Sequence, residues 1–109
     1  MKKSKENSEY YQWGDHWILR DSPQLSVKRK SMSSPTAEKT HFHEKAEQAF
    51  YILKGKAVFH LNNERYIMRE GESICILPKT VHYISNESDD LLDFLAVSSS
   101  TTKNDRVLI

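Results

Sequence analysis

The chain has 109 residues, of which 38% are hydrophobic and 28% are charged, and its formal net charge is +1, which suits one domain with a modest core. A charge near zero gives no electrostatic reason to expect nucleic-acid or membrane binding, and no apolar run approaches the roughly 20 residues of a spanning helix. With one cysteine, Cys75, and no signal-peptide pattern after Met1, we expect no internal disulfide and a cytoplasmic protein.

The N-terminal stretch 1–12 is polar and lysine-rich and lacks apolar spacing of either period. We therefore expect a disordered or loosely docked tail there, with the folded domain over residues 13–97. The alternating run Leu25–Met32 predicts a strand. Its cations Arg29 and Lys30 favour a place at the edge of a sheet, where charge discourages further pairing.

The next stretch, Thr40–Gly55, reads THFHEKAEQAFYILKG and carries the clearest chemical signal. His41 and His43 are two residues apart, so they share a face only if this segment is a strand. Two imidazoles about 7 Å apart along one strand face can converge on a metal ion. A short polar turn leads to a second strand, whose first residues, Glu47 and Gln48, are candidate oxygen ligands.

The rest of the chain alternates short strand-like runs with turns. Asn62 and Asn63 fit a two-residue hairpin turn, because asparagine tolerates positive φ better than most residues. The last core strand is predicted over residues 91–97, and residues 98–109 are expected to form a C-terminal tail. Turn signals about every 8–12 residues, with no convincing helix, are typical of an all-β sandwich or barrel.

Two segments resemble the conserved motifs of the cupin superfamily. The first, HFHEKAEQAFYILKG, follows a pattern of two histidines, a glutamate and a glycine, with Gln48 in the glutamate position. The second, GESICILPKTVHYISN, resembles a motif that ends in a histidine and an asparagine, here His82 and Asn86. It departs from that motif where Leu77 and Lys79 replace the usual proline and glycine. The resemblance implies a single-domain, cupin-type double-stranded β-helix, or jelly-roll, barrel.

The resemblance also implies a divalent transition-metal ion held by four side chains: His41, His43, Gln48 and His82. Gln48 has the family spacing, but a carboxylate binds such an ion more strongly than an amide, so the adjacent Glu47 stays as the alternative. Three imidazoles and an amide suit Zn, Fe, Ni, Mn or Cu, and the sequence does not choose among them. Because these four ligands are neutral, the ion would keep its full charge and favour Lewis-acid chemistry on anionic oxygens.

Several other residues can be placed by strand alternation. Phe50 and Phe59 are predicted to line a substrate pocket. His60 is on the other parity from Phe59 and is expected to point outward, and His16 is expected at the surface. Cys75 is interpreted as a small buried residue and not as a nucleophile, because no neighbouring base is evident.

The resemblance supports several functions. One is a metal-dependent dioxygenase, isomerase or lyase acting on a small oxygen-rich metabolite that is anionic or carries a carbonyl. The alternative is a non-catalytic cupin that binds a small molecule or uses the metal structurally. No general acid or base is identified, so the catalytic residues stay unassigned. We also expect a homodimer, because exposed strand edges are usually paired and the segment from Trp13 could be an exchanged edge strand.

Overall fold

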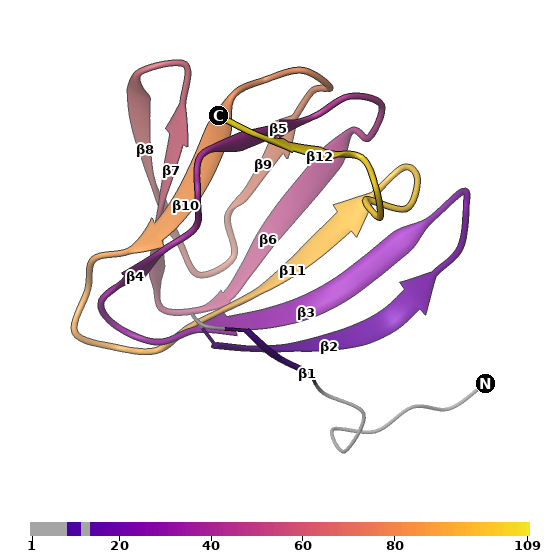
Figure 1. Ribbon diagram of the computed structural model, residues 1–109. Coiled ribbons are helices and arrows are strands. Elements are labelled where there is room, and N and C mark those ends of the chain that lie inside the picture. The colour runs from indigo at the N-terminus through magenta and orange to yellow at the C-terminus, as the bar shows by residue number, and fades with distance from the viewer. Residues whose placement is uncertain (1–8, 12–13) are drawn as a thin grey trace.

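The computed structural model describes residues 9–11 and 14–109, and every regular element in this part of the chain is a β-strand. The strands form two sheets that face one another as the walls of a barrel (Figure 1). This arrangement confirms the predicted all-β jelly-roll fold. None of the described segments is a helix of the length and apolar character that crossing a membrane requires.

The first sheet has the strand order β1-β2-β3-β11-β6-β9. Its strands are β1 (Glu9–Tyr11), β2 (Gly14–Asp21), β3 (Ser26–Met32), β11 (Leu92–Ser98), β6 (Gln48–Lys54) and β9 (Ser73–Ile76). The second sheet has the order β12-β5-β10-β7-β8, and β4 also pairs with β10. Its strands are β12 (Arg106–Leu108), β5 (His41–His43), β10 (His82–Asn86), β7 (Lys56–Leu61), β8 (Glu64–Arg69) and β4 (Thr36–Ala37).

The core lies between the two sheets, because each strand directs alternate side chains inward. The Phe50 ring is central to it, with centroid distances of 5.2 Å to Phe59 and 6.0 Å to Phe94. Further buried apolar side chains complete this core: Met32, Ile52, Ala57, Met68, Ile76, Ile84, Leu92 and Ala96. Their burial supplies the main favourable free energy that holds the sheets together.

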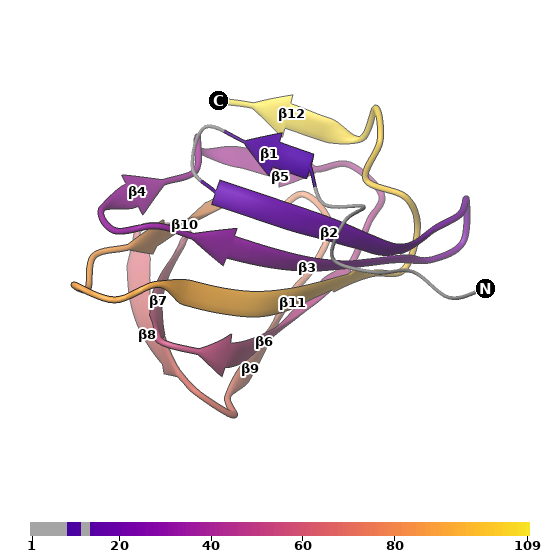
Figure 2. The same cartoon turned by 90° about the horizontal axis from the view of Figure 1, so that it is seen from below.

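Strand β3 is an interior strand, which corrects the expectation that Leu25–Met32 forms a sheet edge. It pairs with β2 on one side and with β11 on the other (Figure 2). The cations do not block pairing, because each has a defined environment. Arg29 faces outward, where its Nε donates to the Asp93 carboxylate at 3.1 Å. Lys30, on the opposite face, lines an internal cavity.

The turns follow the residue types that tolerate positive φ. Asn62 and Asn63 have φ of 47° and 69°, as the predicted hairpin turn requires. Gly55 has φ of 89°, and a Cβ atom on it would lie 2.5 Å from the carbonyl oxygen of Leu91. This glycine therefore closes the turn between β6 and β7 where a side chain would collide with the backbone.

The ends of the described chain are part of the sheets. Residues 1–8 and 12 of the expected N-terminal tail, and Trp13 at the start of the expected exchanged strand, lie outside the described residues, but β1 pairs with β2. In the expected C-terminal tail, β12 pairs with β5. Two burial expectations were wrong: His16 is only 1% exposed, and Cys75 is exposed. His16 is on the inward face of β2, and Cys75 is on the outward face of the edge strand β9.

Candidate metal centre

Three histidines from two paired strands meet at one end of the barrel. His41 and His43 share a face of β5, and the register of β5 with β10 places His82 directly opposite His41. The ring centroids of His41 are 5.2 Å from His43 and 4.4 Å from His82. One ligand nitrogen of each histidine lies within 4.8 Å of the others, and all three side chains are buried. The structure thus brings together the three histidines that the sequence analysis singled out.

Backbone carbonyls orient two of these rings. His41 Nδ1 is 2.7 Å from the carbonyl oxygen of Lys39, and His82 Nδ1 is 2.8 Å from that of Thr80. Because a carbonyl oxygen only accepts, each Nδ1 donates its proton, which leaves the Nε2 lone pair available for a metal. Arg106 Nη2 also lies 3.3 Å from His41 Nδ1 and would need the other tautomer, but the shorter carbonyl contact decides the assignment.

His43 has a different environment. Its Nδ1 is buried and has no hydrogen-bond partner among the described residues. The nearest carboxylate oxygen, Oδ2 of Asp105, is 3.9 Å away. A buried ring nitrogen without a partner is costly unless it binds something, so this orphaned atom fits a metal ligand.

The electrostatics of the cluster favour neutral imidazoles. Burial lowers the pKa of His41 to about 4, against the opposing effect of Glu38. Burial also lowers the pKa of His43 to about 4, helped by His41 and His82. The pKa of His82 is lowered as well, again mainly by burial. Near neutral pH all three rings are therefore in the unprotonated state that can bind a metal ion.

Gln48, the first residue of β6, lines the same cavity as His41 and His43. It is 6% exposed, and its Nε2 donates to Ser98 Oγ at 3.1 Å. Its Oε1 is buried and has no hydrogen-bond partner in the described part of the chain. Glu47 is exposed on the opposite face. The orphaned amide oxygen fits the fourth ligand, whereas the Glu47 carboxylate faces away.

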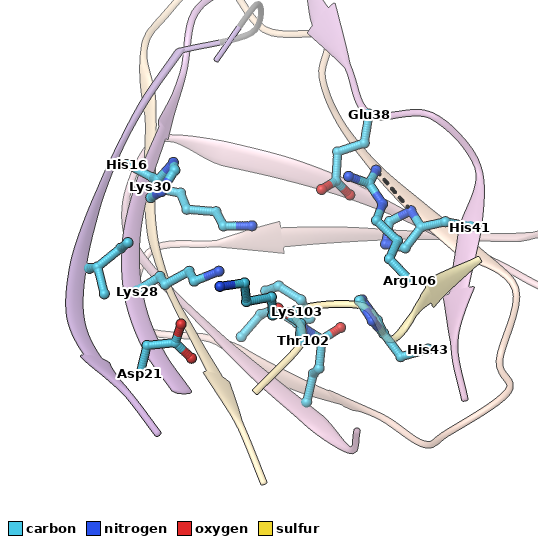
Figure 3. Close-up of a pocket in the computed structure, with 13 residues that line it drawn as sticks. His16, Asp21, Lys28, Lys30, Glu38, His41, His43, Thr102, Lys103 and Arg106 are labelled. Carbon is cyan, nitrogen blue, oxygen red and sulfur yellow. Dashed lines mark hydrogen bonds between the residues drawn. The ribbon is translucent and has the colours of Figure 1, made fainter. Parts of the chain in front are cut away.

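A cavity of about 440 Å³ opens beside this cluster. Figure 3 shows side chains from both sheets converging on it. Its charged residues outside the histidine cluster are Asp21, Lys28, Lys30, Glu38, Lys103 and Arg106. The sequence analysis assigned none of these to the site. Of the two predicted pocket aromatics, Phe50 lines the cavity, whereas Phe59 is fully buried in the core.

Glu38 and Lys30 are the titratable residues of the cavity with the most defined settings. Glu38 is fixed by Ile84, whose backbone N–H donates to its Oε1 at 3.0 Å. Burial lowers the pKa of Lys30 to about 8, and Lys28 and Arg106 act in the same direction while Glu38 opposes them. No local sequence signal marks Glu38, but Lys28 and Lys30 could be found once β3 is known to be an interior strand.

The C-terminal segment completes the cavity. The Asp105 carboxylate accepts hydrogen bonds from the backbone N–H groups of Lys45, at 3.1 Å, and Ala46, at 3.0 Å. Strand β12 then pairs with β5 so that Arg106 lies opposite His43. This anchoring brings Lys103 and Arg106, which are far from the histidines in sequence, onto the cavity wall.

Comparisons with known proteins agree with this fold. The family model described as "Cupin domain" matches residues 32–98. An uncharacterised protein of Methanocaldococcus jannaschii is 38% identical over 66 residues, which cover 59% of this chain and 53% of that protein. An uncharacterised Aquifex aeolicus protein is 33% identical over 54 residues, which cover 50% of this chain and 45% of that protein. This chain thus spans about half the length of the curated relatives it matches.

Solved structures show the same barrel at low sequence identity. A protein from Thermus thermophilus superposes with a TM-score of 0.78 at 21% identity and covers 92% of this chain and 96% of its own. An oxalate decarboxylase from Lactobacillus farciminis, solved as a formate complex, superposes with a TM-score of 0.80 at 22% identity. That match covers 94% of this chain and 33% of the decarboxylase.

Proposed function

Because this chain belongs to the cupin family, we propose that it binds one divalent transition-metal ion and uses it to act on a small oxygen-rich anion. The proposed ligands are His41, His43, Gln48 and His82. The observation that carries the proposal is the convergence of three buried imidazoles whose ligand nitrogens lie within 4.8 Å of one another. Burying such polar groups together is costly unless they bind an ion.

The set of ligands suggests what a bound ion would contribute. When bound, a divalent ion supplies Lewis-acid polarisation of a carbonyl or carboxylate oxygen. The four proposed ligands carry no negative charge. A bound divalent ion would therefore keep its full positive charge, which attracts an anion. The hydrogen bond from Gln48 Nε2 to Ser98 Oγ would hold the amide so that its Oε1, the proposed oxygen ligand, faces the ion.

The residues across the cavity support an enzyme over a purely structural metal site. Lys30 can exchange a proton near neutral pH, because its pKa is about 8. Glu38 is held in place by the backbone of Ile84 and lies close enough to His41 and His82 to affect their pKa values. We propose these two as candidate proton-transfer groups for a dioxygenase, isomerase or lyase reaction. The oxalate decarboxylase with the same fold gives the lyase class support by analogy.

We also propose that the protein forms a homodimer and works in the cytoplasm. Both sheets end in strands with an unpaired edge within the described residues, and such edges are usually covered. Cys75 is an exposed free thiol, which suits a reducing compartment.

Metal analysis of protein purified without a histidine tag tests the proposed function. We expect about one equivalent of transition metal per chain, taken up from a mixture if it is lost in purification. His43→Ala and His82→Ala should each reduce this to less than about a tenth of an equivalent, because they remove a ligand. His60→Ala removes a histidine from the outer face and should keep the full content. Equal metal content in all variants, or none in the unmodified chain, would refute the proposal.

A further inference from the structure

The cavity is lined by more positive than negative side chains, and none of these residues is a proposed metal ligand. Among the described residues that line it, four cations face two carboxylates, an excess of two positive charges, although the whole chain has a formal net charge of only +1. The cations are Lys28, Lys30, Lys103 and Arg106, and the carboxylates are Asp21 and Glu38.

These cations come from two separate parts of the chain and meet across the cavity. Lys28 and Lys30 are on the same face of β3, two residues apart, and both extend into the cavity (Figure 3). Lys103 extends toward Lys28 from the C-terminal segment, and Arg106 lies on the histidine side, 3.3 Å from His41 Nδ1. The positive charge therefore extends from the histidine cluster to the opposite wall.

The cluster is electrostatically unfavourable without a bound anion. Burial is the main cause that lowers the pKa of Lys30; Glu38 opposes it, and Lys28 and Arg106 lower it further because these cations repel Lys30. In the described part of the chain, Lys28 and Lys103 form no ion pair with a carboxylate. Like charges gathered around a partly enclosed cavity cost free energy, and a bound anion offsets that cost.

We propose that the substrate is a small dianion whose two acidic groups are bound at opposite ends of the cavity. This rests on the proposed function, since one acidic group binds at the metal position beside Arg106. The second is bound by Lys28 and Lys103 on the far wall. A single negative charge would interact with only one end of this lining. Lysine ammonium groups bind either carboxylate or phosphate oxygens as point charges, so the second acidic group can be a carboxylate or a phosphate.

The size and shape of the site favour a small metabolite over a polymer. A cavity of about 440 Å³ is within the range of roughly 300–1,000 Å³ for small-molecule sites. The four cations line the cavity from both walls and point into it (Figure 3). A nucleic-acid backbone instead needs a stripe of cations along a surface, because its phosphates are spaced along an extended strand.

The test compares probes that differ by one charge, using metal-loaded protein at constant ionic strength. Succinate carries two carboxylates, and its monoamide, succinamate, has nearly the same shape with one. Calorimetry should show succinate binding about 10-fold or more tightly than succinamate, which is the scale of a charge-assisted contact. 3-Phosphonopropionate, which has a phosphonate in place of one carboxylate of succinate, is the second arm, and the tighter of the two probes identifies the second acidic group as carboxylate or phosphate-like.

Two double variants test whether Lys28 and Lys103 on the far wall cause the preference for succinate over succinamate. Lys28→Gln with Lys103→Gln should reduce the succinate-to-succinamate ratio to about 2-fold or less, because one acidic group then has no cationic partner. Lys54→Gln with Lys56→Gln removes the same charge outside the cavity and should keep the ratio. Equal binding of the two probes by the unmodified protein would overturn the inference, and so would a ratio that both double variants keep.

Metal content separates this inference from the proposed function. The Lys28 and Lys103 variants should retain the metal stoichiometry of the unmodified protein, because neither residue is a proposed ligand. Normal metal uptake without discrimination between the probes would overturn the dianion inference and leave the metal function intact. Lysine-dependent discrimination in a protein that binds no metal would refute the metal function and support the far-wall anion site.

Discussion

Gln48 decides the charge of the candidate metal centre, because a neutral amide takes the place of a carboxylate. Its side chain is buried on the histidine side, whereas that of the adjacent Glu47 is exposed. We expect Gln48→Ala to weaken metal binding by roughly 10–100-fold, the scale seen when a supporting residue of a metal site is lost. Glu47→Ala is the matched control and should change the affinity little. The reverse ranking in a metal titration would show that Glu47 is the ligand.

The same buried histidines should make the metal-free protein sensitive to mild acid. Their ordinary pKa is about 6.5, and in the folded protein those of His41 and His43 are about 4. Well above pH 6.5 the rings are neutral in both states and add no pH dependence. Between about pH 6.5 and 4 the unfolded chain binds protons that the folded one does not, so the free energy of unfolding falls as pH falls.

Urea denaturation of metal-free protein at several pH values measures this dependence. His43→Gln removes one of the groups with a lowered pKa. Unfolding between about pH 6.5 and 4 should then take up about one proton fewer, so the free energy of unfolding should fall less steeply as the pH falls. An identical pH profile for His43→Gln and the unmodified protein would show that His43 does not resist protonation.

At the scale of the elements, two turn glycines with similar backbones give a controlled comparison. Gly55 and Gly71 have φ of 89° and 81°, so alanine is strained at both. A Cβ at Gly55 would lie 2.5 Å from the carbonyl oxygen of Leu91, whereas one at Gly71 meets nothing within 4 Å. Gly71→Ala should cost about 1–2 kcal/mol, and Gly55→Ala about 2–5 kcal/mol, because the β6–β7 turn must also shift.

Chemical denaturation of the two glycine variants gives both free energies of unfolding directly. Equal costs would mean that the turn at Gly55 yields to the added methyl group without loss. The difference between the variants isolates the collision with Leu91, since the backbone strain is nearly the same in both.

Local patterns were enough to predict some elements and not others. The HFH strand and the Asn62–Asn63 turn depend on neighbouring residues, so alternation and φ preferences identified them. The interior position of β3 depends on pairing with β11, and the outward contact Arg29–Asp93 joins residues 64 apart in sequence. Sequence alone does not specify that pairing, so the inward role of Lys28 and Lys30 was missed.

The residues of the candidate site also divide into those that a sequence pattern identifies and those that only the folded structure brings together. His41 and His43 share a strand, and His82 followed from the resemblance of the second segment to a known motif. Glu38 and Arg106 reach the cavity because β4 and β5 both pair with β10 and β12 pairs with β5. Their roles depend on the assembled barrel and have no local signature.

At the scale of the whole molecule, the outer face of the first sheet has an apolar surface that a second copy would cover. Strand register places Tyr51 of β6 beside Leu95 of β11, and Leu95 beside Arg29 of β3. Tyr51 is 44% exposed and Leu53, on the same face of β6, is 37% exposed. Large apolar side chains grouped on one sheet face are typical of protein–protein contacts. We therefore expect the proposed homodimer to bury this face.

Light scattering after size exclusion tests the dimer at tens of micromolar. We expect a mass roughly twice the 12.7 kDa of one chain. Tyr51→Glu with Leu53→Glu should shift the mass to that of the monomer, because buried unpaired carboxylates oppose association. Tyr66→Glu with Ile67→Glu makes the same change on β8 of the second sheet, where both residues are exposed, and should leave the dimer intact. A monomeric unmodified protein would refute the dimer, and dissociation only by the β8 variants would place its interface on the second sheet.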